Sequence, residues 1–191
     1  MFRKMFVFAA LSCLSALAFA QEGHDPMKAM MEAGALGPQH EMMAKYVGEW
    51  DCAVKIWMDP TQPPMESKGS EVCKMEMGGR VCACDFTGDM MGSTFHGQSQ
   101  MGFSNFAKQY WATWTDDMST GMMYAEGTAS EDGKTITLLG SYDDPMSGTM
   151  DKPWKQVMTM VNDDKHVFSA YENVGTPEEY KTMEITYTRK K

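Results

Sequence analysis

Four cysteines are the residues of this sequence whose type and spacing most clearly indicate chemistry. They are Cys52, Cys73, Cys82 and Cys84, once Cys13 is assigned to an N-terminal leader described below. An even number of cysteines in an exported protein is typical of disulfide bonds. A thiolate metal site is the alternative, because the spacing of Cys82 and Cys84 places both thiols on one face of a strand. Zinc sites, however, more often use cysteines separated by two residues in a loop.

Gly78 and Gly79 predict the pairing of two of these cysteines. Two adjacent glycines between alternating apolar residues are typical of a two-residue hairpin turn. With the turn at these glycines, Cys73 lies directly opposite Cys84. Opposed residues of an antiparallel pair can lie about 4.5 Å apart at Cα, which a disulfide can bridge. We therefore expect a Cys73–Cys84 disulfide, with Cys52 and Cys82 as the remaining pair.

Methionine is the second unusual feature, with 22 residues in a chain of 191. Its thioether side chain is apolar and fills irregular gaps in a core, and it is also a ligand of Cu(I). We favour the structural interpretation, which needs no cofactor, and keep a periplasmic copper-binding protein as the alternative. The candidate copper ligands lie in one N-terminal cluster, here called the methionine–histidine segment: His24, Met27, Met30, Met31, His40, Met42 and Met43. We interpret the other two histidines, His96 and His166, as ordinary strand residues.

The sequence contains none of the common catalytic motifs. A nucleophile elbow, a zinc-protease helix motif and a phosphate-binding loop are all missing. Paired carboxylates such as Asp116 and Asp117 are adjacent in sequence, and adjacent residues of a strand point in opposite directions. We therefore expect a protein that is not an enzyme. An enzyme that acts on a bound ligand is a further alternative, for which the sequence offers no nucleophile.

Residues 1–20 have the pattern of a secretory signal. Arg3 and Lys4 precede an apolar stretch, and Ala18-Phe19-Ala20 gives a small-x-small cleavage site. We expect a mature protein that begins at Gln21 and resides in the periplasm or outside the cell. No later stretch reaches the roughly 20 apolar residues of a spanning helix, so we expect no stable membrane insertion.

The charge of the chain argues against two classes of partner. Its 17 basic and 26 acidic residues give a net charge of −9, which becomes −11 when the leader is removed with Arg3 and Lys4. Nucleic-acid binding needs a basic face, and docking on an anionic bilayer needs basic clusters. A small molecule is therefore the expected partner, and the oligomeric state stays open.

Short helices followed by many strands would position these residues. Asp25-Pro26 is typical of a helix start, and Pro38 begins a second short helix, so residues 21–47 are expected to form a helical cap. From Trp50 onward apolar and polar residues alternate with the period of a strand. About ten short strands separated by turn residues indicate an antiparallel barrel or sandwich over residues 48–191. Four aromatic residues could line its interior and contact an apolar ligand: Tyr110, Trp111, Trp114 and Trp154.

The start of the first strand, Gly48-Glu49-Trp50, resembles the Gly-x-Trp start of the calycin superfamily, which includes the lipocalins and the fatty-acid-binding proteins. In lipocalins this tryptophan packs across the closed end of the barrel, and an arginine near the end of the chain stacks on it. The resemblance implies a calycin-like antiparallel β-barrel in which Trp50 and Arg189 meet. It also implies that a small, largely apolar ligand binds inside the barrel.

A second resemblance covers roughly residues 38–190 and concerns the bacterial family called domain of unknown function 1579. It rests on Pro38-Gln39-His40-Glu41, Gly48-Glu49-Trp50, Gly78-Gly79-Arg80, Met90-Met91-Gly92, Trp114-Thr115-Asp116, Met118-Ser119-Thr120-Gly121-Met122-Met123, Asp144-Pro145-Met146-Ser147-Gly148 and the ending from Met183 to Lys190. The family implies no activity. Several methionines belong to its pattern, which favours a structural role for them.

Overall fold

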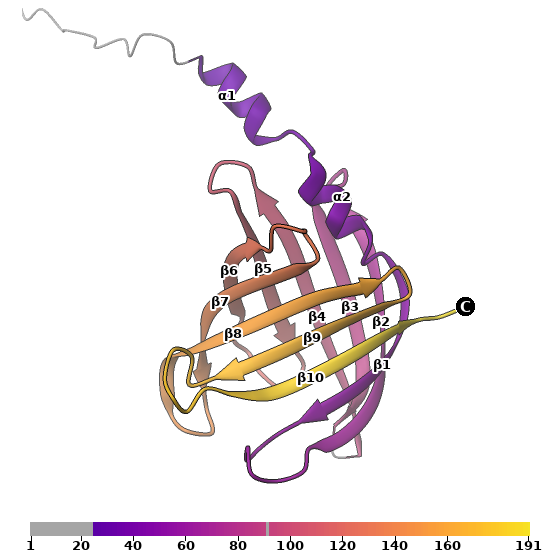
Figure 1. The fold of residues 1–191 in the computed structure, drawn as a ribbon, viewed down its shortest axis with the longest axis vertical. Helices are drawn as coiled ribbons and strands as arrows, with labels where there is room; N and C mark the ends of the chain where they lie inside the picture. The colour runs from indigo at the N-terminus through magenta and orange to yellow at the C-terminus, as the bar shows by residue number, and fades with distance from the viewer. Residues whose placement is uncertain (1–24, 91) are drawn as a thin grey trace, which may run out of the picture.

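The computed structural model describes residues 25–90 and 92–191. Two short helices precede a closed barrel of ten antiparallel strands, so the predicted fold class is confirmed (Figure 1). The predicted leader, residues 1–20, and His24 lie outside the described residues. The elements are α1 (Pro26–Ala33), α2 (Pro38–Ala44), β1 (Gly48–Ile56), β2 (Met65–Glu76), β3 (Val81–Met90), β4 (Ser93–Ser104), β5 (Gln109–Asp116), β6 (Met123–Ala129), β7 (Thr135–Asp144), β8 (Thr149–Asn162), β9 (Lys165–Glu172) and β10 (Tyr180–Arg189).

Each strand pairs with its neighbours in sequence, and β1 pairs with β10 to close the barrel. Alternate residues of every strand therefore face the interior. On β1 the inward residues are Trp50, Cys52 and Val54, all buried, while the residues between them are exposed. The same alternation continues across the sheet, because the register places Trp50 opposite Arg189 on one side and opposite Glu71 on the other.

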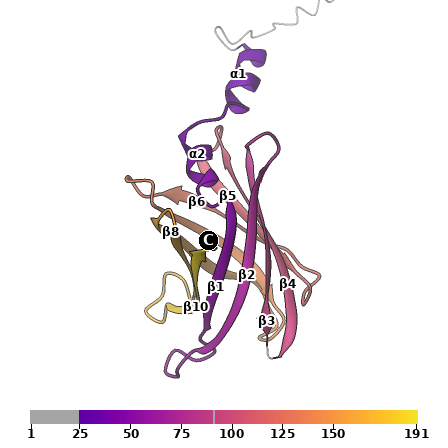
Figure 2. The same ribbon diagram turned by 90° about the vertical axis from the view of Figure 1, so that its right-hand side faces the viewer.

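The two helices differ in their relation to the barrel. The carboxylate of Asp25 caps α1 by accepting hydrogen bonds from the backbone N–H groups of Met27 and Lys28, and no residue of α1 is buried. Figures 1 and 2 show α1 extending away from the barrel, whereas α2 lies at its rim. His40 and Met43 of α2 are buried, so α2 covers one end of the barrel, here called the capped end.

Two polar side chains of the barrel hold the segment between the helices. The guanidinium of Arg80 donates hydrogen bonds to the carbonyl of Gly34, with its Nη2 at 2.6 Å. The amide of Asn105 donates to three carbonyls, of which that of Ala35 is nearest at 2.7 Å. The end of α1 and the segment that follows it are therefore fixed to the β2–β3 and β4–β5 turns.

The most tightly packed part of the core lies toward the capped end. The largest side chains without solvent contact are Trp50, Met43, Ile136, Leu138 and Cys82. The opposite end, where β1 ends at Ile56 and β10 begins at Tyr180, is here called the far end. Among the described residues, no helix is long and apolar enough to cross a bilayer.

Candidate functional site

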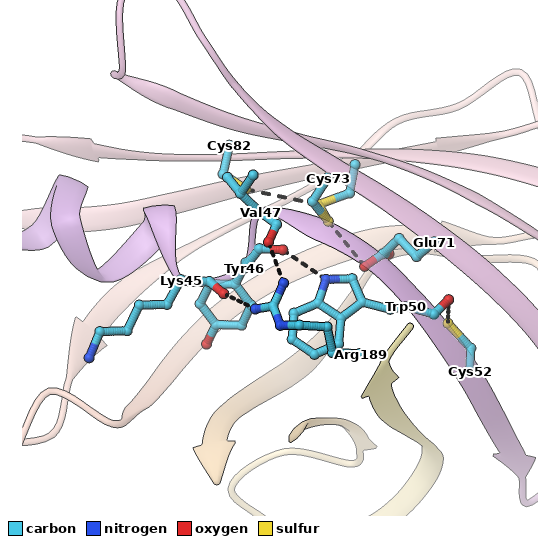
Figure 3. The surroundings of a disulfide bond; sticks show 10 residues. Lys45, Tyr46, Val47, Trp50, Cys52, Glu71, Cys73, Cys82 and Arg189 are labelled. Atoms are coloured by element: carbon cyan, nitrogen blue, oxygen red, sulfur yellow. Dashed lines mark hydrogen bonds between the residues drawn. A yellow bond between two sulfur atoms is a disulfide. The ribbon is translucent and has the colours of Figure 1, made fainter. Parts of the chain in front are cut away.

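The capped end is closed by a contact between the first and last strands. The central carbon of the Arg189 guanidinium lies 4.0 Å from the centroid of the Trp50 ring. The same guanidinium donates hydrogen bonds to the carbonyls of Lys45, Val47 and Asp163, at 2.7–3.0 Å. The indole N–H of Trp50 donates to the carbonyl of Tyr46 at 2.8 Å (Figure 3). Arg189 thus joins the end of α2 and the β8–β9 turn to the capped end of the barrel.

His166 lies directly inside this closure and is not an ordinary strand residue. Its ring stacks on Tyr187 with 4.1 Å between centroids, and it meets the rings of Trp50 and Tyr46 edge-on. Burial and the nearby charge of Arg189 lower the pKa of His166 to about 3, so the ring is neutral at physiological pH. The signal available in the sequence was its place on the same strand face as Phe168 and Ala170; its position opposite Tyr187 is a finding of the structure.

Among the described residues, three buried polar atoms have no hydrogen-bond partner: the hydroxyl of Tyr46, the indole nitrogen of Trp154 and Nε2 of His166. Burial also raises the pKa of the Tyr46 hydroxyl above its ordinary value. Buried polar atoms without partners are costly. Because of these groups, the interior near the capped end is polar as well as aromatic.

A disulfide joins Cys73 on β2 to Cys84 on β3, as the position of the hairpin predicts. The two residues are directly opposed, with 4.1 Å between their Cα atoms. Cys52 and Cys82 are free and buried, so the predicted second pair is wrong. The physical reason is register: Cys52 faces Gly69 and Tyr187, while Cys82 faces Met75 and Met101. Strand β2 separates the two thiols.

Glu71 is the functional candidate that the sequence analysis missed. It faces Trp50 on one side and Phe86 on the other, and only 6% of it is exposed. Its Oε2 atom lies 3.3 Å from Sγ of Cys73. Burial raises the pKa of its carboxyl to about 7. The available signal was its position two residues before Cys73, which places both side chains on the same face of β2.

Partly buried apolar side chains face the interior near both ends of the barrel, with Met75 and Phe103 among them at the capped end. Near the far end, such side chains pack against the core but keep part of their surface accessible to solvent. This set, here called the lower lining, comprises Ile56, Met90, Trp114, Met123, Tyr142, Phe168 and Met183. A ten-stranded barrel is wider than an eight-stranded one, which already has room for one small ligand. A barrel of this width can therefore leave space for a small molecule beside the lower lining.

Charged side chains lie at the edge of this space. Lys152 forms ion pairs with Asp144 at 2.9 Å and with Glu172 at 2.7 Å. The hydroxyl of Tyr142 donates a hydrogen bond to the other oxygen of Glu172 at 2.7 Å. Lys152 and Tyr142 are direct partners in the β7–β8 register. The polar groups are thus satisfied by one another, and the lower lining remains the apolar part of the interior.

Three of the four predicted ligand-binding aromatics face inward, and Trp111 does not. Tyr110 and Trp154 are buried in the core, while Trp114 is half-buried. Trp111 packs on the outside of the barrel, where its indole covers Gly102 so closely that an added Cβ would lie 2.3 Å from it. Adjacent strand residues point to opposite faces, so Tyr110 and Trp111 could not both line the interior. Of the four, Trp114 alone belongs to the lower lining.

The methionine–histidine segment is divided between two environments. Met27, Met30 and Met31 are exposed on α1. His40 and Met43 are buried under α2, and Nδ1 of His40 accepts a hydrogen bond from the backbone of Gly37. Met42 packs partly against the core. The described members of this segment therefore do not form one set of exposed ligands.

A hollow of about 770 Å³ lies at the capped end, between α2 and the turns, and the inward-facing Tyr110 and Met160 form part of its lining. Charged groups of both signs border it, among them Glu41, Lys45, Lys108 and Asp132. Its lining is therefore mixed, whereas the lower lining is mainly apolar. It is the less suitable place for an apolar ligand.

Solved structures with the same fold support the architecture. Protein Rv2717c from M. tuberculosis matches with a TM-score of 0.57 and 15% identity, over 82% of this chain and 100% of the other. The S-type phycobiliprotein lyase CPES from Guillardia theta matches with a TM-score of 0.55 and 12% identity, over 79% of this chain and 92% of the other. No curated protein sequence is significantly similar. The model of one sequence family, described as a protein of unknown function, matches residues 35–189. The chain therefore belongs to the DUF1579 family.

Proposed function

We propose that the protein binds a small, largely apolar ligand inside the barrel, against the lower lining, without chemical change to the ligand. The observation that carries the proposal is a set of inward-facing apolar side chains that keep part of their surface accessible to solvent inside a closed barrel. The capped half is closed by Trp50, Arg189 and α2. The far half presents half-exposed apolar side chains, including Trp114 and Phe168, to the interior of the barrel. Ligand sites are typically apolar cavities with a few polar groups.

Lys152, Asp144 and Glu172 provide those polar groups. They lie at the edge of the lower lining on β7, β8 and β9 and are already arranged as an ion-paired cluster. A ligand with one polar end could hydrogen-bond to this cluster while its apolar part contacts Trp114 and Met183. An apolar molecule with one polar end is therefore the class of ligand that fits this arrangement best.

Two residues argue for binding rather than catalysis. Glu71 and His166 are buried titratable groups of types that enzymes use in catalysis, and both lie in the half of the interior nearer the capped end. Neither belongs to the lower lining. The phycobiliprotein lyase shares the barrel at 12% identity, which supports the common fold and gives no residue for a reaction here.

We also propose that the protein acts outside the cytoplasm, after cleavage following Ala20. The basic start, apolar stretch and small-x-small site of residues 1–20 support this location. The Cys73–Cys84 disulfide agrees with it, because disulfides persist in oxidising compartments. N-terminal sequencing of protein isolated from its host should begin at Gln21, and a chain that retains residues 1–20 would contradict the proposal.

The binding proposal can be tested with the fluorescent apolar probe anilinonaphthalene sulfonate. We expect saturable binding to the folded protein. Trp114→Ala should weaken it by about fivefold to tenfold, the effect of losing one aromatic contact. Trp111→Ala is the matched control, because both tryptophans cover a glycine of β4 but only Trp114 faces inward. Equal effects of the two substitutions would contradict binding inside the barrel.

A further inference from the structure

Three cysteine sulfurs lie together inside the barrel, beside the disulfide. The sulfurs of Cys73, Cys82 and Cys84 all lie within 4.8 Å of one another, and those of Cys82 and Cys84 are 4.0 Å apart. These three residues are here called the sulfur cluster. They come from the adjacent strands β2 and β3, whose pairing fixes their positions. Cys52, the other free cysteine, is not part of this group, and its nearest polar contact is the carbonyl of Trp50 at 3.9 Å.

The carboxyl of Glu71 points at the sulfur cluster without a donor of its own. Its only hydrogen-bonding contact among the described residues is Sγ of Cys73 at 3.3 Å. That sulfur is bonded to Cys84 and carries no proton, so in the oxidised protein the contact is not a hydrogen bond. The contact drawn as a dashed line between Glu71 and Cys73 in Figure 3 can thus become a hydrogen bond only when Cys73 is reduced, and until then Glu71 is a buried acid without a donor among the described residues. A positive ion beside it would remove this deficiency.

We propose that reduction of the Cys73–Cys84 disulfide opens a zinc site formed by the thiolates of Cys73, Cys82 and Cys84 with the carboxylate of Glu71. In the oxidised protein, two of the three sulfurs are bonded to each other and cannot act as thiolate ligands. The site therefore exists only in the reduced protein. Disulfide and metal exclude one another.

The reduction step requires a dithiol as the reductant. One dithiol attacks the disulfide, the Cys73–Cys84 sulfur–sulfur bond breaks, and the dithiol becomes a disulfide, so two electrons and two protons pass to the cysteines. When Zn²⁺ then binds, the three thiols release three protons. A proton leaves Glu71 as well when its carboxyl is protonated beforehand.

The distances suit tetrahedral zinc. With zinc–sulfur bonds of about 2.3 Å, thiolates of such a site lie about 3.8 Å apart, and a carboxylate oxygen lies about 3.5 Å from each sulfur. The observed 4.0 Å between the sulfurs of Cys82 and Cys84 and 3.3 Å between Glu71 and Cys73 are close to these values. Glu71 is not part of the set of atoms within 4.8 Å of one another, so its carboxylate must turn from Cys73 toward the ion when zinc binds. An oxygen ligand favours zinc over Cu(I), which prefers sulfur ligands alone. The pairing of β2 with β3 keeps Cys73 and Cys84 adjacent after reduction.

The test is a titration of the purified full chain with Co²⁺ as a spectroscopic probe, followed by displacement with Zn²⁺. One sample has its disulfide intact, and the other is reduced and freed of reductant without oxygen. We expect the reduced protein to bind one equivalent with sulfur-to-cobalt charge-transfer absorption, and the oxidised protein to show none. Absence of this absorption in the reduced protein would overturn the proposal, and so would equal binding by the oxidised protein.

Two matched variants assign the ligands. Cys82→Ser should abolish the charge-transfer signal or weaken binding strongly, whereas Cys52→Ser, at the other buried free cysteine, should leave it unchanged. Glu71→Gln should weaken binding by about tenfold or more, the scale found when a carboxylate that supports a metal is removed. Circular dichroism verifies that each variant is folded, and Cys82→Ala replaces Cys82→Ser when the serine variant does not fold. Binding in a folded Cys82 variant equal to that of Cys52→Ser would refute the site.

Discussion

The guanidinium of Arg189 lies over the indole of Trp50, with its central carbon 4.0 Å from the ring centroid, and the two residues are direct partners in the pairing that closes the barrel. One side chain therefore covers the first inward residue of β1 and binds three carbonyls from α2's end and the β8–β9 turn. Because these contacts join the ends of the sequence, their loss should affect the whole barrel.

Arg189→Ala should lower the free energy of unfolding by about 2 kcal/mol or more. A desolvated cation–π contact contributes about 2 kcal/mol, and hydrogen bonds from a charged group contribute about 1.5 kcal/mol or more each. Urea denaturation measures the change. Lys190→Ala is the control, because the only contact that the Lys190 side chain makes with a charged group of the described residues is an exposed ion pair with Asp51 at 3.8 Å. Equal stability of the two variants would show that Arg189 does not hold the barrel closed.

Gly48 should tolerate no side chain, for a reason that involves the same arginine. Its φ is 134°, and an added Cβ would lie 2.3 Å from Nη1 of Arg189. Gly133 has a φ of 70° with open space around it, so Gly133→Ala measures the cost of a left-handed backbone conformation without a steric clash, about 1–2 kcal/mol. We expect Gly48→Ala to destabilise the protein more than Gly133→Ala in thermal or urea unfolding. The reverse order would exclude a steric role for Arg189.

Glu71 should give the stability of the oxidised protein a characteristic dependence on pH. Burial raises its pKa from 4.5 to about 7, so the folded protein holds a proton that the unfolded chain has lost. The stabilisation is therefore complete below pH 4.5 and is lost as the pH rises through 7. His166 acts in the opposite direction: its pKa falls from 6.5 to about 3 on folding, so its contribution is complete above pH 6.5 and is lost as the pH falls toward 3.

Glu71→Gln separates these two effects. The variant stays neutral, so relative to the natural protein its stability should rise by about 3 kcal/mol between pH 4.5 and pH 8, at about 1.4 kcal/mol per pH unit of the pKa shift. The difference between two pH values is informative even when the buried amide costs stability at every pH. Glu66→Gln, on the exposed part of the same strand, is the control. Parallel pH profiles for Glu71→Gln and the natural protein would contradict the effect of burial on Glu71.

The Cys73–Cys84 disulfide should stabilise the protein by about 3 kcal/mol, the loop-closure value for a loop of this length. Its residues are 11 apart in sequence. Urea unfolding with and without a reductant, in the presence of a chelator, measures the effect. The double variant Cys73→Ser and Cys84→Ser should not respond to the reductant. Peptide mapping without reduction should recover Cys73 joined to Cys84 and free thiols at Cys52 and Cys82, and any other pairing would contradict the structure.

The sequence predicted the features that depend on local pattern. Alternation predicted the strands, and Gly78-Gly79 predicted the register that brings Cys73 to Cys84. The pairing of Cys52 was not predictable in this way, because the loop after Ile56 sets the β1–β2 register and places Cys52 opposite Gly69. The prediction that Trp111 lines the interior was wrong for a reason that the sequence did contain. Trp111 directly follows Tyr110, and adjacent strand residues point to opposite faces.

The candidate site was harder to predict than the fold, because it depends on contacts between distant segments. In the sequence Glu71 cannot be distinguished from an exposed polar strand residue. Its burial follows from the pairing of β2 with β1 and β3, which places Trp50 and Phe86 on either side of it. His166 likewise acquires its low pKa only from the burial and the charge of Arg189. The sequence also did not distinguish buried from exposed methionines. Met101 and Met160 are buried, as a core role requires, whereas Met58 and Met77 are exposed outside the strands.

Cu(I) binding by the methionine–histidine segment should be weak. Three of its thioethers, Met27, Met30 and Met31, are exposed on α1, but His40 and Met43 are enclosed beneath α2. Recruiting the buried ligands would require α2 to leave the barrel, which would expose Met43. Copper binding at Nδ1 of His40 would also displace the hydrogen bond that this atom accepts from the backbone of Gly37.

Anaerobic calorimetric titration with Cu(I), on protein whose disulfide is intact, measures this affinity. Replacing Met27, Met30 and Met31 together by leucine should abolish the weak binding without changing the unfolding transition, because α1 contributes no buried residue. Leucine preserves apolar character and helix propensity, so any difference reports the thioethers. Tight stoichiometric binding that survives these substitutions would show that α1 is not the copper ligand. It would favour a metal-binding function over the binding of an apolar ligand, and would direct attention to the remaining sulfur ligands inside the barrel.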